Sequence, residues 1–239
     1  MGCPLTLSLA AAALNRTALI AAKMAAAVAK LPPFIEGVWV TEWSFNANGD
    51  SPQKELRMYG TWTEGLFCAA VALRYAALER VVLMDKHALI GDASAGQLFS
   101  GTADFAVPGS PDPSLPTKPW TRTASGWTLG LLGEAAAGAA SVAPLQLGGA
   151  GVGAAFFPAS GGGGGRAALL NGGGEPLPVS AATLAAASLG GCTAAKTLSA
   201  DPLLGINNVG ANAVTAAEAP VAHTGVALTL PPWRLTLLS

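Results

Sequence analysis

The chain has 239 residues, of which 50 are alanine and 30 are glycine, and its 13 basic and 14 acidic side chains leave a formal net charge of −1. This balance excludes the basic surface typical of nucleic-acid-binding proteins, and glycine without a three-residue period excludes collagen. Three widely spaced cysteines and two histidines form neither a disulfide framework nor a metal-ligand pattern, so we expect no metal and no cofactor.

The first predicted element is a helix over residues 5–30, where Ala, Leu, Ile and Met dominate up to a pair of prolines. Its apolar start resembles the core of a signal peptide. However, no basic residue precedes it, and the pattern continues through Arg16 and Lys23. Residues 135–165 carry no charge and are numerous enough to cross a bilayer, but their glycines and prolines favour loop and strand. The sequence therefore predicts no membrane span and shows no convincing targeting signal.

A strand–helix–strand unit follows the first helix. Residues 37–41 are a β-branched and aromatic run that predicts a strand buried on both faces. Thr61-Trp62-Thr63-Glu64 has the form of a capping box and predicts a helix that continues to about Arg80. Val81–Met84 is the next predicted strand. This order is typical of the βαβ unit of a parallel sheet.

The composition changes near residue 140. Residues 1–134 hold 21 of the 27 charged side chains, and a helix is predicted over residues 123–140. Beyond it, short apolar runs are separated by Gly, Pro and Asn clusters, as in Val142–Leu147, Ala167–Leu170 and Val226–Leu230. This pattern is typical of an all-β sandwich. We therefore expect an α/β segment over residues 1–140 and a β-sandwich over residues 141–239, with a Gly-rich insertion at 148–165.

Candidate site residues lie at the expected carboxyl ends of the two parallel strands, where α/β folds bind their ligands. Glu42 ends the first strand and His87 follows the second, so neighbouring strands would bring both within reach of one ligand. Trp43 offers a flat apolar face of the kind that stacks on a sugar ring. The alternatives are a solvated carboxylate at Glu42 and a hydrogen-bonded structural imidazole at His87.

Several motifs resemble a known enzyme family. They are Val38-Trp39-Val40-Thr41-Glu42-Trp43-Ser44, Gly60-Thr61-Trp62 at a helix start, His87-Ala88-Leu89-Ile90-Gly91 and Gly96-Gln97-Leu98-Phe99. In this order they resemble the last two βα units of a retaining glycoside hydrolase of the barrel clan, closest to the α-L-arabinofuranosidase-like enzymes. Residues 166–171 and 228–237 are similar to strands of the β-sandwich that follows the barrel in that group. The resemblance implies an incomplete (β/α)8-type barrel followed by a C-terminal β-sandwich.

The resemblance also implies a mechanism and a carbohydrate partner. Glu42 corresponds to the catalytic nucleophile, and Trp43 and His87 would bind the substrate, a plant- or algal-type polysaccharide or glycoside. A retaining enzyme needs a second carboxyl group, the acid/base, about 5–5.5 Å from the first. In the family this glutamate lies on an earlier strand, and only 41 residues precede Glu42. We therefore expect a C-terminal fragment that is inactive alone.

Two other functions are compatible with the sequence. A non-catalytic carbohydrate-binding or wall-associated protein would keep the sandwich without the chemistry. An Ala/Gly-rich structural chain would share the motifs by accident. An extracellular or secretory location is expected for the family, and the sequence does not indicate an oligomeric state.

Overall fold

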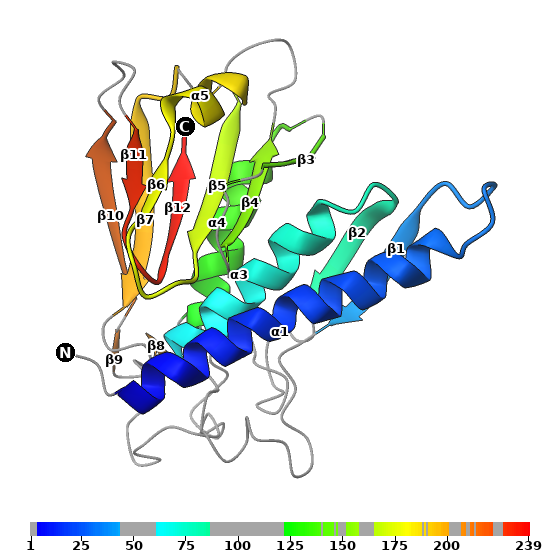
Figure 1. Cartoon of the computed structure of the whole chain (residues 1–239), viewed down its shortest axis with the longest axis horizontal. Coiled ribbons are helices and arrows are strands. Elements are labelled where there is room, and N and C mark those ends of the chain that lie inside the picture. Colours follow the sequence, from blue (N-terminus) through cyan, green and yellow to red (C-terminus); the bar gives the residue numbers. More distant parts are fainter. Residues whose placement is uncertain are drawn as a thin grey trace.

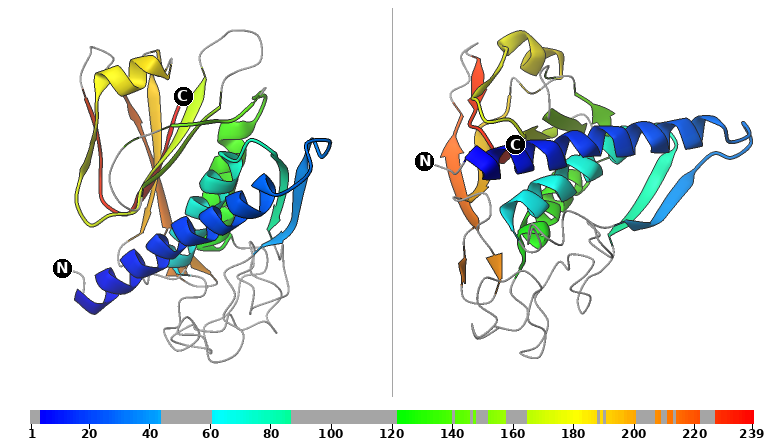
Figure 2. Two further views of the ribbon diagram at one scale, coloured as in Figure 1. Left: turned by 45° about the vertical axis from the view of Figure 1, so that its right-hand side comes forward. Right: turned by 60° about the horizontal axis from the view of Figure 1, so that its bottom comes forward.

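The structure is a computed structural model that describes residues 4–43, 61–86, 122–139, 141–145, 147, 152–157, 165–187, 189, 191–200, 207–208, 211–212, 214–221 and 227–239. A layer of helices lies against one face of an antiparallel sheet, and a small parallel pair of strands lies at the far end of this layer (Figures 1 and 2). The chain thus combines a βαβ unit with an antiparallel sheet, as the sequence predicts.

The first helix, α1 (Pro4–Ala29), packs along α3 (Trp62–Ala76) by one stripe of side chains. Ala10, Leu14 and Thr17 are buried in this stripe at helical spacing. The Thr17 hydroxyl donates to the Leu14 carbonyl at 2.6 Å and accepts from Arg74 Nε of α3 at 3.1 Å. The predicted N-terminal helix is confirmed, and this contact ties it to the rest of the chain.

Residues Ala10–Ala29 of α1 are also long and apolar enough to cross a membrane, and 17% of this stretch is buried. Helices that pack against a protein core and signal sequences share this length and composition. A single such helix does not support a membrane span.

The predicted βαβ unit is confirmed. Strand β1 (Val38–Trp43) pairs in parallel with β2 (Val81–Lys86), and α3 connects them. The helix begins as the sequence predicts, because Thr61 is its N-cap and the Thr61 hydroxyl accepts from the Glu64 amide at 3.4 Å.

The prediction that residues 37–41 are buried on both faces is wrong. Trp39 is 68% exposed, and Val82 of the neighbouring strand is 61% exposed. In the described part of the chain, β1 and β2 form a sheet of only two strands. Helices cover one face of this pair, and the apolar side chains of the other face contact solvent.

The C-terminal part forms the six-stranded antiparallel sheet β10-β7-β12-β5-β4-β3. Its strands are β3 (Ala143–Pro144), β4 (Val152–Phe157), β5 (Arg166–Asn171), β7 (Ala194–Ala200), β10 (Val214–Pro220) and β12 (Arg234–Leu238). Two further pairs are β6 (Leu177–Val179) with β11 (Leu228–Leu230) and β8 (Asn207–Asn208) with β9 (Ala211–Asn212). The expected inner strand 166–171 is confirmed as β5, and β4 lies within the Gly-rich segment 148–165.

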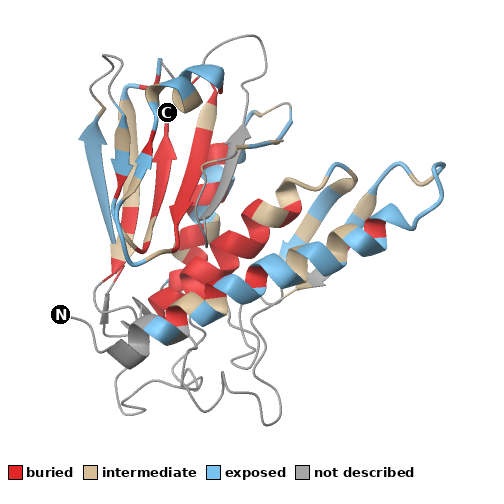
Figure 3. Ribbon diagram, viewed as in Figure 1, coloured by how far each residue is buried: buried red, intermediate tan, exposed pale blue. Residues whose placement is uncertain are grey.

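The central strands β5 and β12 are buried on both faces, since successive side chains point to opposite faces of the sheet and a core lies on each side. On β5, Ala168 and Leu170 face the helices α3 and α4 (Ala124–Ala136). Ala167 and Leu169 face a second, smaller core that includes residues of β6 and β11 and the end of α5 (Ala181–Ala186). Figure 3 shows α3, β5 and β12 buried along most of their length. The larger core therefore joins residues on both sides of position 140.

One hydrogen bond links the two ends of this core. The Trp62 side chain is fully buried at the start of α3, and its Nε1 donates to the Trp233 carbonyl at 3.0 Å, across 171 residues of sequence. Trp233 lies in the turn between β11 and β12 with a φ of 55°, a left-handed conformation that few non-glycine residues adopt. Its amide donates to the Gly173 carbonyl at 3.2 Å. These bonds hold the turn over the start of α3.

We expect residues 1–140 expressed alone to be poorly soluble or partly molten. In that segment α3 and α4 would expose to solvent the faces that Leu170, Leu235 and Leu237 now cover. Thermal unfolding followed by circular dichroism would show a broad, weakly cooperative transition, with residues 141–239 as the comparison. A sharp cooperative melt of residues 1–140 alone would contradict this expectation.

We expect Trp62→Phe to lower the free energy of unfolding by about 1–3 kcal/mol, because it removes a buried hydrogen bond and part of a core side chain. Urea denaturation measures this loss. The matched control is Trp39→Phe, since Trp39 is 68% exposed and its replacement should change the free energy by less than about 0.5 kcal/mol. Equal losses in the two variants would mean that the bond to Trp233 adds nothing.

Candidate functional site

The candidate site lies where β1 and β2 end. Their parallel pairing brings both carboxyl ends to the same edge, and Trp43 is paired with Lys86 there. Position 42 therefore lies within β1 directly beside this edge. His87 is the residue after the end of β2 and lies outside the described residues. The strand arrangement matches the one that the sequence predicts, and the catalytic role of Glu42 and the binding role of His87 stay predictions.

A β-bulge interrupts β1 next to position 42. Val40 pairs with Met84 and Trp43 with Lys86, so three steps along β1 match two along β2. The extra residue turns the strand, and such bulges are common beside active sites because they change the direction of a side chain. Here Trp43 lies on the same side as the buried Val40, facing the helices.

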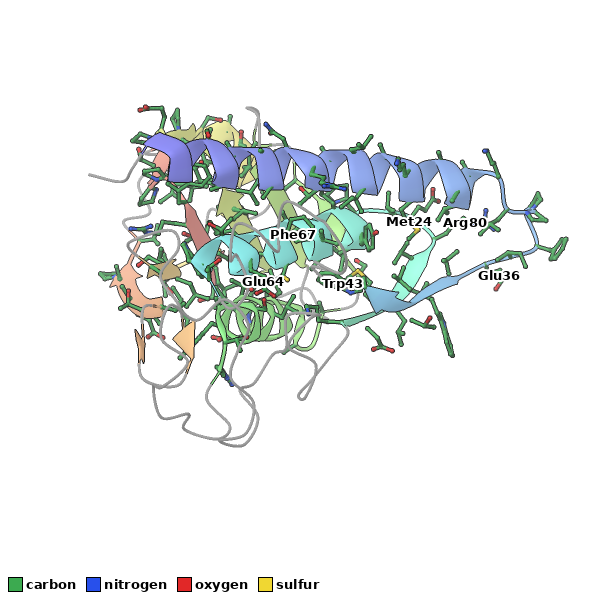
Figure 4. The ribbon with its side chains drawn as sticks, turned by 90° about the horizontal axis from the view of Figure 1, so that it is seen from below. Met24, Glu36, Trp43, Glu64, Phe67 and Arg80 are labelled. Carbon is green, nitrogen blue, oxygen red and sulfur yellow. The ribbon has the colours of Figure 1, made fainter. Side chains whose placement is uncertain are left out.

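Trp43 packs against α3. Its ring lies edge-on to that of Tyr75, with centroids 6.5 Å apart and an interplanar angle of 63°. Figure 4 shows the side chain at the end of β1 that lies beside α3. The indole Nε1 is buried and has no hydrogen-bond partner in the described part of the chain. Leaving a buried donor unpaired costs about 1–3 kcal/mol. Stacking of Trp43 on a sugar stays a prediction.

Beside this indole lies a cavity of about 400 Å³. It separates the carboxyl ends of β1 and β2 from the helices α3 and α4. Apart from Lys86, its lining is mostly aliphatic and aromatic: Trp43, Ala72, Leu73, Ala76, Met84, Leu129, Leu132, Gly133, Ala136 and Val142. Its volume is within the range of small-molecule sites in proteins.

A buried polar network joins α3 to α4. The Ser125 hydroxyl donates to Glu64 Oε1 at 3.0 Å and lies 3.4 Å from Cys68 Sγ. All three side chains are buried, and Figure 4 shows Glu64 on the side of α3 that faces α4. The Ser125 hydroxyl thus supplies a hydrogen bond to the Glu64 carboxyl group, whose burial without a partner would be costly in free energy.

This network gives Glu64 a structural explanation. Glu64 is 1% exposed and bonded to Ser125 between two helices, so its carboxyl group lies in the interior and not on the surface. It is therefore a poor choice for the acid/base of a glycosidase. Among the described residues, no three His, Cys, Asp or Glu side chains gather closely enough to hold a metal ion.

Comparison with solved structures relates this architecture to known enzymes. An arabinofuranosidase is similar with a TM-score of 0.54 and 11% identity, over 84% of this chain and 42% of that one. An arabinose-bound α-L-arabinofuranosidase of family 51 gives 0.52 and 14%, over 82% and 31%. A family 51 α-L-arabinofuranosidase from Bifidobacterium longum gives 0.52 and 12%, over 74% and 33%. No protein-family model and no curated sequence matches the chain.

The resemblance to α-L-arabinofuranosidases that the sequence motifs suggest is therefore confirmed for the fold. The chain spans 31% to 42% of the length of these enzymes. At identities of 11% to 14%, the likeness concerns the fold and carries no residue's role by itself.

Sequence reasoning missed Tyr75, Lys86 and Gly133 as neighbours of the site. Lys86 directly precedes His87 at the end of a predicted strand, and this position could have identified Lys86 as a neighbour of the site from the sequence. Tyr75 and Gly133 lie on two different helices, and only the packing of α3 against α4 brings them near Trp43.

We expect the Cys68 thiol to be unreactive in the folded protein. Burial raises the pKa of this thiol most, Lys86 lowers it, Glu64 raises it and the contact with Ser125 lowers it, so that together they raise the pKa to about 12. In a chain carrying Cys3→Ser and Cys192→Ser, iodoacetamide at pH 8 should modify Cys68 only after unfolding in urea, as read by intact mass. A cysteine placed at the exposed Ala26 is the positive control.

The same shift predicts a pH dependence of stability. The folded thiol binds its proton more tightly than an ordinary thiol of pKa 9.0, so its contribution is complete below that pH. The contribution is lost as the pH rises from there toward 12, and a Cys68→Ala chain should lack this component. Rapid modification of folded Cys68 at pH 8 would contradict both statements.

Proposed function

We propose that this chain is the nucleophile-bearing, C-terminal part of a retaining glycoside hydrolase, made of the last βα units of a barrel and the β-sandwich that follows. The observation that carries the proposal is the parallel β1–β2 pair, which has position 42 at its carboxyl end beside a bulge. The similarity of the fold to α-L-arabinofuranosidases adds support. The substrate class is a glycoside of plant or algal type.

In this proposal the Glu42 carboxylate attacks the anomeric carbon and the glycosidic bond breaks. The resulting glycosyl ester is then hydrolysed by water, which restores the carboxylate. The imidazole of His87, one residue beyond β2, would bind the same sugar from the neighbouring strand. Trp43 fixes the end of β1 against Tyr75, and in the proposal it also borders the bound sugar.

The proposal assigns the acid/base carboxyl to polypeptide outside these 239 residues. Glu64 is held by Ser125 in the interior, and this chain spans only 31% to 42% of the length of the structurally similar enzymes. The chain alone would then form a glycosyl ester only with a leaving group that needs no protonation.

Mechanism-based labelling tests the nucleophile. The reagent is a 2-deoxy-2-fluoro-α-L-arabinofuranoside that carries a dinitrophenyl leaving group. The dinitrophenolate departs without protonation by an acid, and the fluorine atom slows hydrolysis of the glycosyl ester. We expect one sugar to be added to the peptide containing Glu42, as read by mass spectrometry. The chain is assayed alone and mixed with the amino-terminal barrel portion of the Bifidobacterium longum enzyme.

Two variants control this experiment. Glu42→Gln should lose the label completely. Glu36→Gln should keep it, because Glu36 is exposed and precedes β1 at the end far from Trp43 (Figure 4). The proposal would be overturned if Glu42 carried no label either in the chain alone or in the mixture with the barrel portion, or if Glu36 carried the label. Sugar binding without ester formation would favour the non-catalytic alternative.

A further inference from the structure

The outer side of α1 carries a row of basic side chains. Arg16 and Lys23 lie seven residues apart on the helix, and Lys30 follows its last residue after another seven. Seven residues are close to two helical turns, so the three side chains lie along one side of α1. All three are exposed, and this side faces away from the buried stripe that packs against α3.

No negative charge balances this basic row. The first acidic residue of the chain is Glu36, and among the described residues none of the three basic side chains has an ion-pair or hydrogen-bond partner. Apart from Lys23, every exposed residue of α1 between Arg16 and Lys30 is an alanine or Leu19. A helix surface that combines basic and apolar side chains without acidic ones is complementary to an anionic lipid surface.

An exposed aromatic side chain lies just beyond the end of the basic row. Phe34 is 78% exposed in the turn between α1 and β1, which projects at the opposite end of the molecule from β10 (Figures 1 and 2). The Arg80 guanidinium fixes this turn by donating hydrogen bonds to four backbone carbonyls, those of Val28, Leu31, Pro32 and Ile35. Phe34 is thus presented to solvent on a fixed backbone, and its transfer into an apolar environment would be favourable.

We propose that the outer side of α1 and the turn at Phe34 bind the surface of an anionic lipid bilayer. The basic row would contact lipid phosphates, and Phe34 would enter the boundary between headgroups and acyl chains. The helix would lie along the bilayer and not cross it, since its other side is packed on α3 and bonded through Thr17 to Arg74. An acidic polysaccharide would match the basic row but would offer Phe34 no acyl chains. The proposal does not depend on the chemistry of Glu42.

Co-sedimentation of the full chain with extruded vesicles tests the proposal. We expect phosphatidylcholine vesicles with about one third phosphatidylglycerol to bind at least about tenfold more tightly than pure phosphatidylcholine, and added salt to weaken this binding. Lys23→Gln should lower the affinity about fivefold. Its control is Ala217→Glu, which changes the net charge equally at an exposed position of β10. Phe34→Ser should lower the affinity about tenfold. Its control is Trp39→Ser, since Trp39 is exposed on the face of β1 away from the helices. Thermal melting confirms that each variant is folded.

The proposal is wrong if the wild type binds neither kind of vesicle or binds both equally. It is also wrong if Lys23→Gln binds as well as Ala217→Glu, or if Phe34→Ser binds as well as Trp39→Ser, because the contact would then lie elsewhere. Binding of soluble polygalacturonate without binding of anionic vesicles would identify an acidic polysaccharide as the partner instead of lipid. Loss of the label at Glu42 in the preceding experiment changes none of these outcomes.

Discussion

The enclosure of α3 is the constraint on which the rest of the structure depends. Every residue from Trp62 to Leu73 is buried, because α1, α4 and the six-stranded sheet each cover part of this helix. The hydrogen bond from Trp62 to the Trp233 carbonyl fixes the start of the helix to the turn before β12. Since α3 also connects β1 to β2, this anchoring sets where the parallel strands lie relative to the sheet.

The strand ends acquire their chemical character from this arrangement. A bulge before Trp43 turns the indole toward α3, where it meets Tyr75 and borders the aliphatic cavity. The edge that carries position 42 and the helix-facing side that carries the cavity belong to the same two strands.

Local signals were sufficient to predict most elements. The cap at Thr61, the apolar stretch of α1 and the strands β1, β2 and β5 follow from side-chain type and spacing, which act within a few residues. Exposure of Trp39 could not be predicted this way, because a run of apolar residues looks the same whether or not a neighbour covers it. The bond from Ser125 to Glu64 was equally hidden, since it joins residues 61 positions apart.

The amino-acid sequence by itself determined the βαβ order, the change to short strands after residue 140 and the position of Glu42 at a strand end. Its motifs also indicated the fold shared with α-L-arabinofuranosidases. The tertiary structure decided which face of each strand is covered, that Glu64 belongs to the interior and that Trp43 borders a cavity. The physical reason is that propensity and capping act over a few residues, whereas burial and hydrogen-bond pairing depend on segments brought together only by packing.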